Sequence, residues 1–462
     1  MTEGYWEKGE IAVVGLGRSG DAAARLLRTR HAAVYASDVE STAATRAVAD
    51  ALRLAGVDAD VGAHDLERIA RASLVVTSPG IPPDAPPLRA ARQAKVPIVS
   101  EVEIALAAMP HARYIAVTGT NGKSTVTSLI GHLLTALGRE AETAGNIGRA
   151  LCDVALQART PEWIALEISS YQLHDTPGLA PTVGVLTNLA PDHLDRYPSI
   201  DAYYADKALL FRNARPESRW VVNVDDTRAM ALTEDIAGFV MRFSANGRLA
   251  DAFYDRRHDM LILLDEPLMR RAELPLLGMH NVGNALAAAL AVATADDSHT
   301  SLDARRKIAD ALRVAHALPH RLEIVGEVDG ILWVNDSKAT NVASARVGIA
   351  GMTRPTVLLL GGRHKGEPYA GLIAPIREHC KAVLAFGEAA EIIQCDLSAE
   401  VPVQLVRGTF EDVVSRARDL AKPGDCVLLS PACSSFDMFS NYEERGRVFS
   451  GLARGSGARG TA

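Results

Sequence analysis

A glycine-rich stretch that ends in a lysine and two hydroxyl residues is the first place where the sequence indicates chemistry. GTNGKST covers residues 119–125, follows the apolar run YIAV and precedes a helix expected over residues 123–137. Such a turn points backbone N–H groups at phosphate, brings a lysine near the β- and γ-phosphates and offers a hydroxyl to Mg²⁺. The pattern predicts an ATP loop made by Gly119, Thr120, Asn121, Gly122, Lys123, Ser124 and Thr125.

This loop is shorter than the common phosphate loop. The usual Gly-x-x-x-x-Gly-Lys-Ser/Thr pattern needs a glycine at position 117, where valine stands. An ordinary strand–turn–helix junction with a solvent-exposed lysine is therefore the alternative interpretation.

Other polar residues follow later strands of the same expected sheet. Ligands of open α/β sheets gather at the carboxyl ends of the strands, so Glu167, at the end of WIALE, is a candidate Mg²⁺ ligand. Lys207 lies on an expected helix, where most lysines are exposed. A loop cluster that suits a metal, a substrate or an ordinary turn contains Asn188, Asp192, His193 and Asp195. Asn281 and Asn284 head an Ala-rich helix, where an amide suits adenine or a helix cap.

A second glycine motif lies near the N-terminus. GLGRSG, residues 15–20, follows the strand IAVV and opens a helix, and Asp38 ends the next strand. This is the spacing of a dinucleotide site and favours NAD when it is taken alone. Physically, the glycines let backbone N–H groups approach a diphosphate at the start of a helix. A UDP-sugar also carries a diphosphate, so it fits the same geometry. A purely structural tight turn is the third possibility.

Short apolar runs alternate with helical stretches along the chain, which is typical of parallel sheets with helical crossovers. Three such series predict an α/β protein of three domains. Residues 1–104 form an N-terminal Rossmann-like domain, residues 105–318 a central P-loop ATPase-like domain with a parallel sheet, and residues 319–462 a C-terminal Rossmann-like domain. The proline-rich segment 79–87 is expected to be a loop and GSGARGTA a frayed tail.

Composition narrows the class of protein. The 462 residues carry a net charge of -7, which gives no reason to expect a nucleic-acid partner. The N-terminus lacks the apolar core of a signal peptide and no 18-residue apolar run occurs, so the expected location is the cytoplasm, without membrane insertion. Five cysteines without a C-x-x-C pair indicate reduced thiols rather than disulfides or a zinc site.

Nearly the whole chain resembles the Mur ligases, ATP-dependent amide ligases that build the peptide of bacterial cell-wall precursors. The resemblance rests on GLGRSG, SPGI, GTNGKST, GNIG, EISSYQL, DHLDRYPS, HNVGNALAA, LPHRLE, NDSKATN, LLLGG and SPACSSFDMFSNYEERG. The family's phosphate loop is G-x-x-G-K-S/T, which GTNGKS matches. The branch most similar to this chain adds D-glutamate to UDP-N-acetylmuramoyl-L-alanine. A related ligase for another amino acid, such as L-glutamate, and an NAD-dependent oxidoreductase stay as alternatives.

The resemblance also implies roles for individual residues. The UDP part of the substrate would be held by Gly17, Arg18, Ser19 and Asp38, and the muramoyl part by Ser78 and Asn146. Lys123, Ser124 and Thr125 would bind ATP phosphates and Mg²⁺, with Glu167 and His193 completing sites for two Mg²⁺ ions, and Lys207 would be a carbamylated metal ligand. Adenine and ribose would contact Asn281, Asn284, Arg321 and Asp336. Nucleotide phosphate and glutamate would be bound by Lys338, Thr340, Lys365, Ser435 and Tyr442. A monomer is the implied state.

Overall fold

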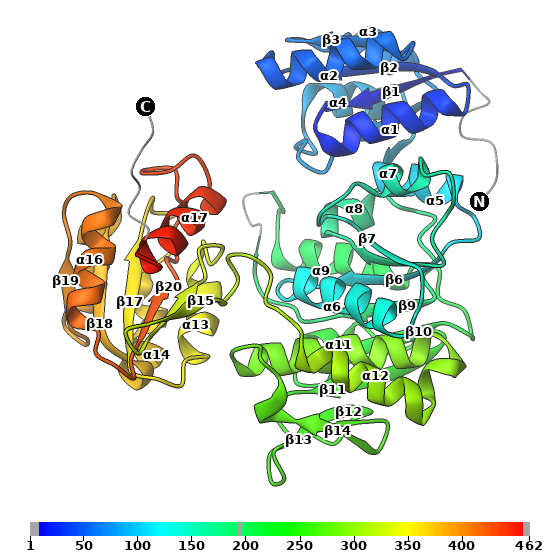
Figure 1. The fold of residues 1–462 in the computed structure, drawn as a ribbon. Helices are drawn as coiled ribbons and strands as arrows, with labels where there is room; N and C mark the ends of the chain where they lie inside the picture. Colours follow the sequence, from blue (N-terminus) through cyan, green and yellow to red (C-terminus); the bar gives the residue numbers. More distant parts are fainter. Residues whose placement is uncertain (1–8, 193–195, 456–462) are drawn as a thin grey trace. The chain divides into compact units, whose positions relative to one another are not determined.

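The computed structural model describes residues 9–192 and 196–455 and contains three β-sheets flanked by helices (Figure 1). His193 and Asp195, the N-terminal residues before Gly9 and most of GSGARGTA lie outside the described residues. Within the described part of the chain, no helix combines the length and apolar character needed to span a bilayer. The α/β fold class expected from the sequence is confirmed.

The first sheet is parallel throughout, with strand order β3-β2-β1-β4-β5. Its strands are β1 (Glu10–Val14), β2 (Ala33–Asp38), β3 (Asp58–Val61), β4 (Leu74–Thr77) and β5 (Ile98–Ser100). Its helices are α1 (Arg18–Thr29), α2 (Ala43–Leu54), α3 (Leu66–Arg71), α4 (Pro86–Gln93) and α5 (Glu101–Ala108). The strand order reverses between β1 and β4, so the loops after these two strands diverge and leave a crevice for a ligand.

The central sheet has nine strands in the order β14-β13-β12-β11-β10-β9-β6-β8-β7. Its strands are β6 (Arg113–Thr118), β7 (Ala141–Gly145), β8 (Trp163–Glu167), β9 (Val183–Leu186), β10 (Arg219–Asn223), β11 (Phe239–Ser244), β12 (Ala252–Asp255), β13 (Met260–Leu263) and β14 (Glu266–Arg270). Its helices are α6 (Lys123–Ala136), α7 (Leu151–Ala155), α8 (Ser170–His174), α9 (Ile200–Ala208), α10 (Thr227–Ala231), α11 (Met279–Ala295) and α12 (Leu302–Arg313). Strands β6 to β12 are parallel to their neighbours in this group. Strands β13 and β14 form an antiparallel edge that the sequence patterns did not indicate.

The third sheet has the order β15-β16-β20-β17-β18-β19, and only β15 is antiparallel to its neighbour among these strands. Its strands are β15 (Glu323–Val328), β16 (Ile331–Asn335), β17 (Thr356–Gly361), β18 (Cys380–Phe386), β19 (Val403–Leu405) and β20 (Cys426–Leu429). Its helices are α13 (Val342–Ala350), α14 (Ile373–His379), α15 (Ala390–Leu397), α16 (Phe410–Leu420) and α17 (Tyr442–Ala453). Short 3₁₀ turns are η1 (Leu209–Phe211), η2 (Arg271–Glu273), η3 (Asp297–Thr300) and η4 (Tyr369–Leu372).

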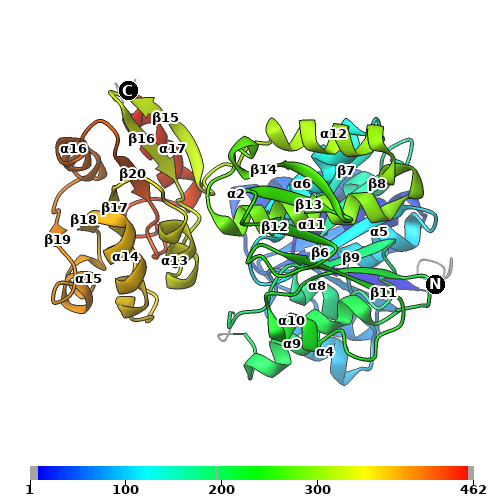
Figure 2. The same cartoon turned by 90° about the horizontal axis from the view of Figure 1, so that it is seen from below.

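The continuous apolar run of β17 follows from helices on both faces of the third sheet. Figure 2 shows α13, α14 and α15 on one face and α16 and α17 on the other. Leu358 and Leu360 pack with the first group, and Val357 and Leu359 pack with the second. Because neither face meets water, the strand needs apolar residues at successive positions.

Residue contacts divide the chain into two compact units. One unit contains residues 1–271 and 283–313, and the other contains residues 272–282 and 314–462. The first two sheets therefore share a unit, and α11 begins in one unit and continues in the other. The three-domain boundaries near residues 104 and 318 stay a prediction.

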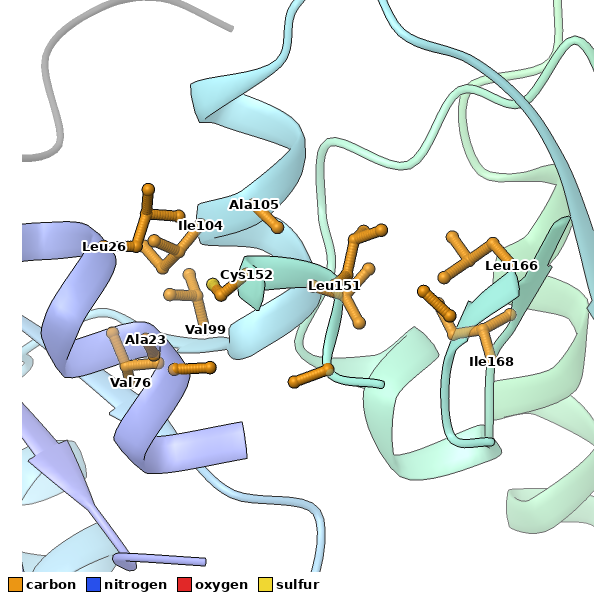
Figure 3. Packing of buried hydrophobic residues seen from close by; sticks show 14 of the residues in the cluster. Ala23, Leu26, Val76, Val99, Ile104, Ala105, Leu151, Cys152, Leu166 and Ile168 are labelled. Atoms are coloured by element: carbon orange, nitrogen blue, oxygen red, sulfur yellow. The ribbon is translucent and has the colours of Figure 1, made fainter. Parts of the chain in front are cut away.

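One cluster of buried side chains joins the first two sheets. Helix α7 provides Leu151 and Cys152, both fully buried. Figure 3 shows these two residues between side chains of the first sheet's layer, such as Ile104, and Leu166 and Ile168 of the central sheet's layer. This shared core positions the loops of the first sheet relative to those of the central sheet.

Candidate active site

The phosphate loop lies between β6 and α6, as its sequence predicts. Gly122 is the residue before the helix and has φ of 83°, a left-handed conformation that favours glycine. A Cβ atom at this position would also lie 2.5 Å from Oδ1 of Asn284, so a larger residue has no room. Lys123 Nζ donates hydrogen bonds to the backbone oxygens of Gly119 (2.9 Å) and Thr120 (2.8 Å). The amine of Lys123 therefore contacts the backbone of the loop that is expected to bind phosphate.

The loop is held from the neighbouring strand β9. Asn188 Oδ1 accepts a hydrogen bond from the Asn121 N–H at 2.9 Å, and Asn188 Nδ2 donates to the Asn121 oxygen at 2.9 Å. The Thr187 hydroxyl donates to that same oxygen at 2.6 Å. Asn188, which the sequence analysis placed in a cluster for metal, substrate or turn, thus fixes the shape of the phosphate loop.

Glu167 ends β8 and is 1% exposed. Its Oε1 atom accepts a hydrogen bond from Asn146 Nδ2 at 2.9 Å. Its Oε2 atom is buried and has no hydrogen-bond partner among the described residues. A buried carboxylate oxygen without a partner destabilises the folded protein, and a bound cation would supply that partner.

Lys207 lies on helix α9 and is buried, whereas most lysines on helices are exposed. The side chain is 1% exposed, and its Nζ donates a hydrogen bond to Thr118 Oγ1 at 3.0 Å. Burial, together with the charge of Lys123, lowers the pKa of this amine well below its usual value, although Glu167 opposes the shift. The surface-lysine interpretation of Lys207 is wrong because helix α9 turns this position toward the end of β6.

The residues around Glu167 fit a divalent cation that is bound partly by substrate. No group of three or more His, Cys, Asp or Glu side chains able to hold a metal occurs in residues 9–192 and 196–455. Ser124, at 7% exposure, and Glu167 supply oxygen atoms of the type that Mg²⁺ prefers. His193, expected to complete the metal sites, lies outside the described residues. Mg²⁺ usually retains water and takes further oxygens from nucleotide phosphates, so two protein ligands are compatible with it.

The GLGRSG loop follows β1 at the topological switch point of the first sheet. Gly20 lies in the first turn of α1. A Cβ atom there would lie 1.7 Å from the oxygen of Gly15, so only glycine fits at this position. Asp38 accepts hydrogen bonds from the Leu16 N–H (2.7 Å) and the Glu40 N–H (2.8 Å). The carboxylate therefore shapes this loop, and its direct contact with UDP stays a prediction.

Two further residues expected to bind the UDP substrate connect neighbouring loops. The Ser78 hydroxyl donates to the Gly15 oxygen at 3.2 Å, across the crevice between β1 and β4. Arg18 Nη1 donates to the Gly148 oxygen at 2.7 Å, next to Asn146. Ser19 follows Arg18 in the first turn of α1. Arg18 thus joins the GLGRSG loop of the first sheet to the GNIG loop of the central sheet, and its contact with the UDP substrate stays a prediction.

The unit that contains residues 314–462 gathers a separate polar group. Lys338 Nζ donates to the Tyr442 hydroxyl at 3.0 Å, and Lys365 Nζ donates to Thr340 Oγ1 at 3.4 Å. Asp336 follows β16 and is 7% exposed. Burial raises its pKa to about 7, while the hydrogen bond from Ser430 and the charge of Arg321 oppose that shift.

The remaining expected contacts lie near the ends of helices or strands. Asn281 Nδ2 donates to the Leu277 oxygen at 2.7 Å, which satisfies its side chain within its own segment. Asn284 is 8% exposed and lies against Gly122 of the phosphate loop. Ser435 is 3% exposed in the segment after β20. Asn284 is thus the expected adenine residue that the structure places beside the phosphate loop.

Arg445 is a positioning residue that the sequence analysis did not single out. It is fully buried and donates hydrogen bonds to the backbone oxygens of Ser337 (2.8 Å), Cys433 (3.2 Å) and Ser434 (3.3 Å). It thereby joins the NDSKATN and SPACSS segments. The only sequence signal was its place within SNYEERG, because an arginine in an amphipathic helix is otherwise expected at the surface.

Comparisons with known proteins agree with this arrangement. The family model for the Mur ligase middle domain matches residues 117–292, the Mur ligase, glutamate ligase domain matches residues 320–433, and the N-terminal domain of MurD-like Mur ligases matches residues 9–100. The UDP-N-acetylmuramoylalanine–D-glutamate ligase of Acidobacterium capsulatum is 39% identical over 96% of this chain and 95% of its own length. The enzyme of the same name from Salinibacter ruber is 38% identical over 97% of this chain and 98% of its own length.

Solved structures share the fold at low sequence identity. The UDP-N-acetylmuramate-alanine ligase MurC of Thermotoga maritima has a TM-score of 0.60 at 19% identity and covers 97% of this chain and 100% of its own. A pseudomurein peptide ligase type C of Methanothermus fervidus has a TM-score of 0.56 at 19% identity and covers 97% and 99%. With the full-length sequence relatives, these matches establish that the chain belongs to the Mur ligase family.

Proposed function

We propose that this chain uses ATP to join D-glutamate to the L-alanine carboxylate of UDP-N-acetylmuramoyl-L-alanine, a step in peptidoglycan precursor synthesis. The curated relatives that carry this activity in their names align over more than 95% of the chain. The phosphate loop with Lys123, the buried Glu167 and the buried Lys207 support an ATP-dependent reaction.

A carboxylate is a poor electrophile, so the reaction must activate it before an amide can form. The alanine carboxylate attacks the γ-phosphate of ATP, which yields an acyl phosphate and ADP. Lys123 would exchange its hydrogen bonds with Gly119 and Thr120 for the β- and γ-phosphates, where it offsets the charge that develops on the transferring oxygens. The position of Lys123 Nζ on the Gly119 and Thr120 oxygens of the loop supports this proposed role.

The amine of D-glutamate then attacks the acyl carbon. A tetrahedral intermediate forms, the C–N bond is made, the amine loses a proton and phosphate leaves. Lys338, Thr340, Lys365, Ser435 and Tyr442 are proposed to bind nucleotide phosphate and glutamate. Exclusion of water protects the acyl phosphate from hydrolysis, so a closed arrangement during this step is part of the proposal.

Ser124, Thr125, Glu167 and His193 are proposed to hold Mg²⁺. The ion would neutralise phosphate charge and orient the transferring group. The unsatisfied Oε2 atom of Glu167 supports this assignment, and the number of two ions is taken from the family resemblance. Asn146 holds Oε1 and leaves the second oxygen available.

Carbamylation of Lys207 is part of the same proposal. Burial and the charge of Lys123 lower the pKa of this amine, which favours its neutral form, and the neutral form is the one that reacts with CO₂. The product would be a carboxylate-like anion at the end of α9, close enough to the phosphate loop to serve as a metal ligand.

The remaining expected contacts complete the substrate sites. Gly17, Arg18, Ser19 and Asp38 are proposed for UDP, Ser78 and Asn146 for the muramoyl part, and Asn281, Asn284, Arg321 and Asp336 for adenine and ribose. A monomer in the cytoplasm is the proposed state. The cytoplasmic location agrees with the proposed substrates, ATP and a UDP-linked sugar, and the monomer is taken from the family resemblance.

Phosphate release by the purified protein tests the assignment. Reactions contain MgATP and UDP-N-acetylmuramoyl-L-alanine with D-glutamate, L-glutamate or no amino acid. We expect release only with D-glutamate, together with the mass of the amide product. Release only with L-glutamate would keep the ATP chemistry and overturn the amino-acid assignment, and no release with either would overturn the ligase function.

A further inference from the structure

Arg196 connects the central part of the chain to the loop of the first sheet that carries Ser78. Its guanidinium donates hydrogen bonds to the backbone oxygens of Ile81 (2.7 Å) and Pro79 (3.4 Å). Both oxygens belong to the loop that follows β4. This side chain of the DHLDRYPS segment therefore holds a loop that is proposed to bind the UDP substrate.

The other side of the guanidinium meets a row of aromatic rings. Arg196 lies 4.1 Å from the ring centre of Tyr171, which stacks on Tyr197 with centres 5.4 Å apart and planes at 11°. Tyr197 contacts Tyr203 at 5.3 Å between centres. A planar cation over an aromatic face and stacked rings keep specific geometries, so movement at one end changes the contacts of the next.

The row ends at the phosphate loop. The hydroxyls of Tyr203 and Thr120 are 3.2 Å apart, within hydrogen-bond distance. The ring of Tyr203 also lies 5.4 Å from Nζ of Lys207. A continuous set of contacts therefore runs from the Ser78 loop to the residues that are proposed to hold ATP.

A cavity beside this row makes Arg196 important for the position of the loop. The cavity has a volume of about 280 Å³. Its lining includes Ser78, Ile81, Leu88, Tyr171 and Arg196. Where a void replaces close packing, a loop loses dispersion contacts that would fix its position. The hydrogen bonds of Arg196 across the edge of this void take over that role.

From these contacts we propose that Arg196 is a positioning residue that couples binding of the UDP substrate to binding of ATP. The inference rests on the proposed function, because the ligand of the Ser78 loop is the UDP substrate. Binding at the Ser78 loop fixes the carbonyls that Arg196 holds, and the aromatic row passes that restraint to Thr120. Coupling of this kind is reciprocal, so ATP must strengthen UDP-substrate binding by the same factor.

Isothermal titration calorimetry of the full chain measures this coupling. The dissociation constant of UDP-N-acetylmuramoyl-L-alanine is determined with and without a non-hydrolysable ATP analogue and Mg²⁺. We expect the analogue to strengthen binding to the wild type by a factor in the range of about 5 to 150. In Arg196→Ala this factor should fall close to one, and Arg196→Lys should fall nearly as far because a lysine lacks the planar two-pronged donor.

Two further variants separate coupling from general damage. Arg92→Ala removes an arginine from the same cavity whose side chain donates to the oxygen of Pro83 within the first sheet's own layer, and it should keep the wild-type factor. Tyr203→Phe removes the hydroxyl near Thr120 at the opposite end of the row and should lower the factor without weakening UDP-substrate binding measured alone. Because both act on one chain of contacts, the double variant with Arg196→Ala should lose no more than the larger single loss.

Several outcomes would overturn the inference. A wild-type factor of one, or an unchanged factor in a folded Arg196→Ala or Tyr203→Phe protein, would remove Arg196 from this role while leaving the ligase function intact. Additive losses in the double variant would show two independent effects and also contradict it. Failure of the wild type to bind the UDP substrate at all would instead refute the proposed function on which the inference rests.

Discussion

The two glycine-rich loops share a backbone plan and differ in the charges around them. Each follows a strand of a parallel sheet and opens a helix, at Arg18 in the first case and at Lys123 in the second. Around GLGRSG, the carboxylate of Asp38 accepts hydrogen bonds from backbone N–H groups. Near GTNGKST, the charges of Lys123 and the buried Glu167 both act on the buried amine of Lys207. The two loops thus share their glycine geometry, and they differ in the buried ionisable side chains near the second loop.

The largest effect is expected for Lys123→Ala. Loss of the cation that meets the transferring phosphate should lower kcat by about 10²- to 10³-fold, as for other groups that stabilise developing charge. UDP-substrate affinity in the absence of nucleotide should stay unchanged, because GLGRSG is intact. Steady-state kinetics and calorimetry check the two halves. Full activity would mean that GTNGKST is only a structural turn.

Lys207→Ala should also abolish most ligation, but for the opposite electrostatic reason. If the lysine acts as a carbamate, the variant lacks an anion, and added acetate should restore part of the activity. Acetate should not help Lys123→Ala, which lacks a cation. Phosphate release across an acetate series makes the measurement. Full activity of Lys207→Ala without acetate would exclude the carbamate role.

Two glycine substitutions in the first loop separate its packing from its proposed contact with substrate. Gly20→Ala should destabilise the fold by about 3 kcal/mol, since the new methyl group would collide with the Gly15 oxygen. Gly17→Ala meets no atom within 4 Å and should change stability by less than about 1 kcal/mol. It should nevertheless weaken UDP-substrate binding by about tenfold if a diphosphate approaches there. Urea unfolding and calorimetry separate these effects, and equal stability of the two variants would contradict the packing.

The smallest expected effect is that of Asp38→Asn. The amide keeps one acceptor oxygen and presents its NH₂ group to one of two backbone N–H donors, so the loop loses one hydrogen bond worth about 1 kcal/mol. UDP-substrate affinity should fall about fivefold, and ATP binding should not change. A loss of 100-fold or more in calorimetry would instead indicate direct contact between the carboxylate and the substrate.

Much of the local structure could be predicted from sequence patterns. The helix expected over residues 123–137 is observed at Lys123–Ala136. Its start is marked by Gly122, whose left-handed backbone conformation favours glycine. The hairpin of β13 and β14 was not predicted, because periodicity alone cannot assign the short apolar run MLIL and because Pro267 within β14 argues against a strand.

By itself, the sequence determined the α/β class, the positions of both glycine loops and, through its motifs, the resemblance to a ligase family. These are properties of neighbouring residues, which local backbone preferences and spacing encode. Only the tertiary structure decided that Lys207 is buried beside Thr118, that Asp38 shapes its own loop, and that Arg196 spans to Pro79 and Ile81. Burial and hydrogen bonding between distant residues depend on how strands and helices pack, and sequence spacing does not encode that packing.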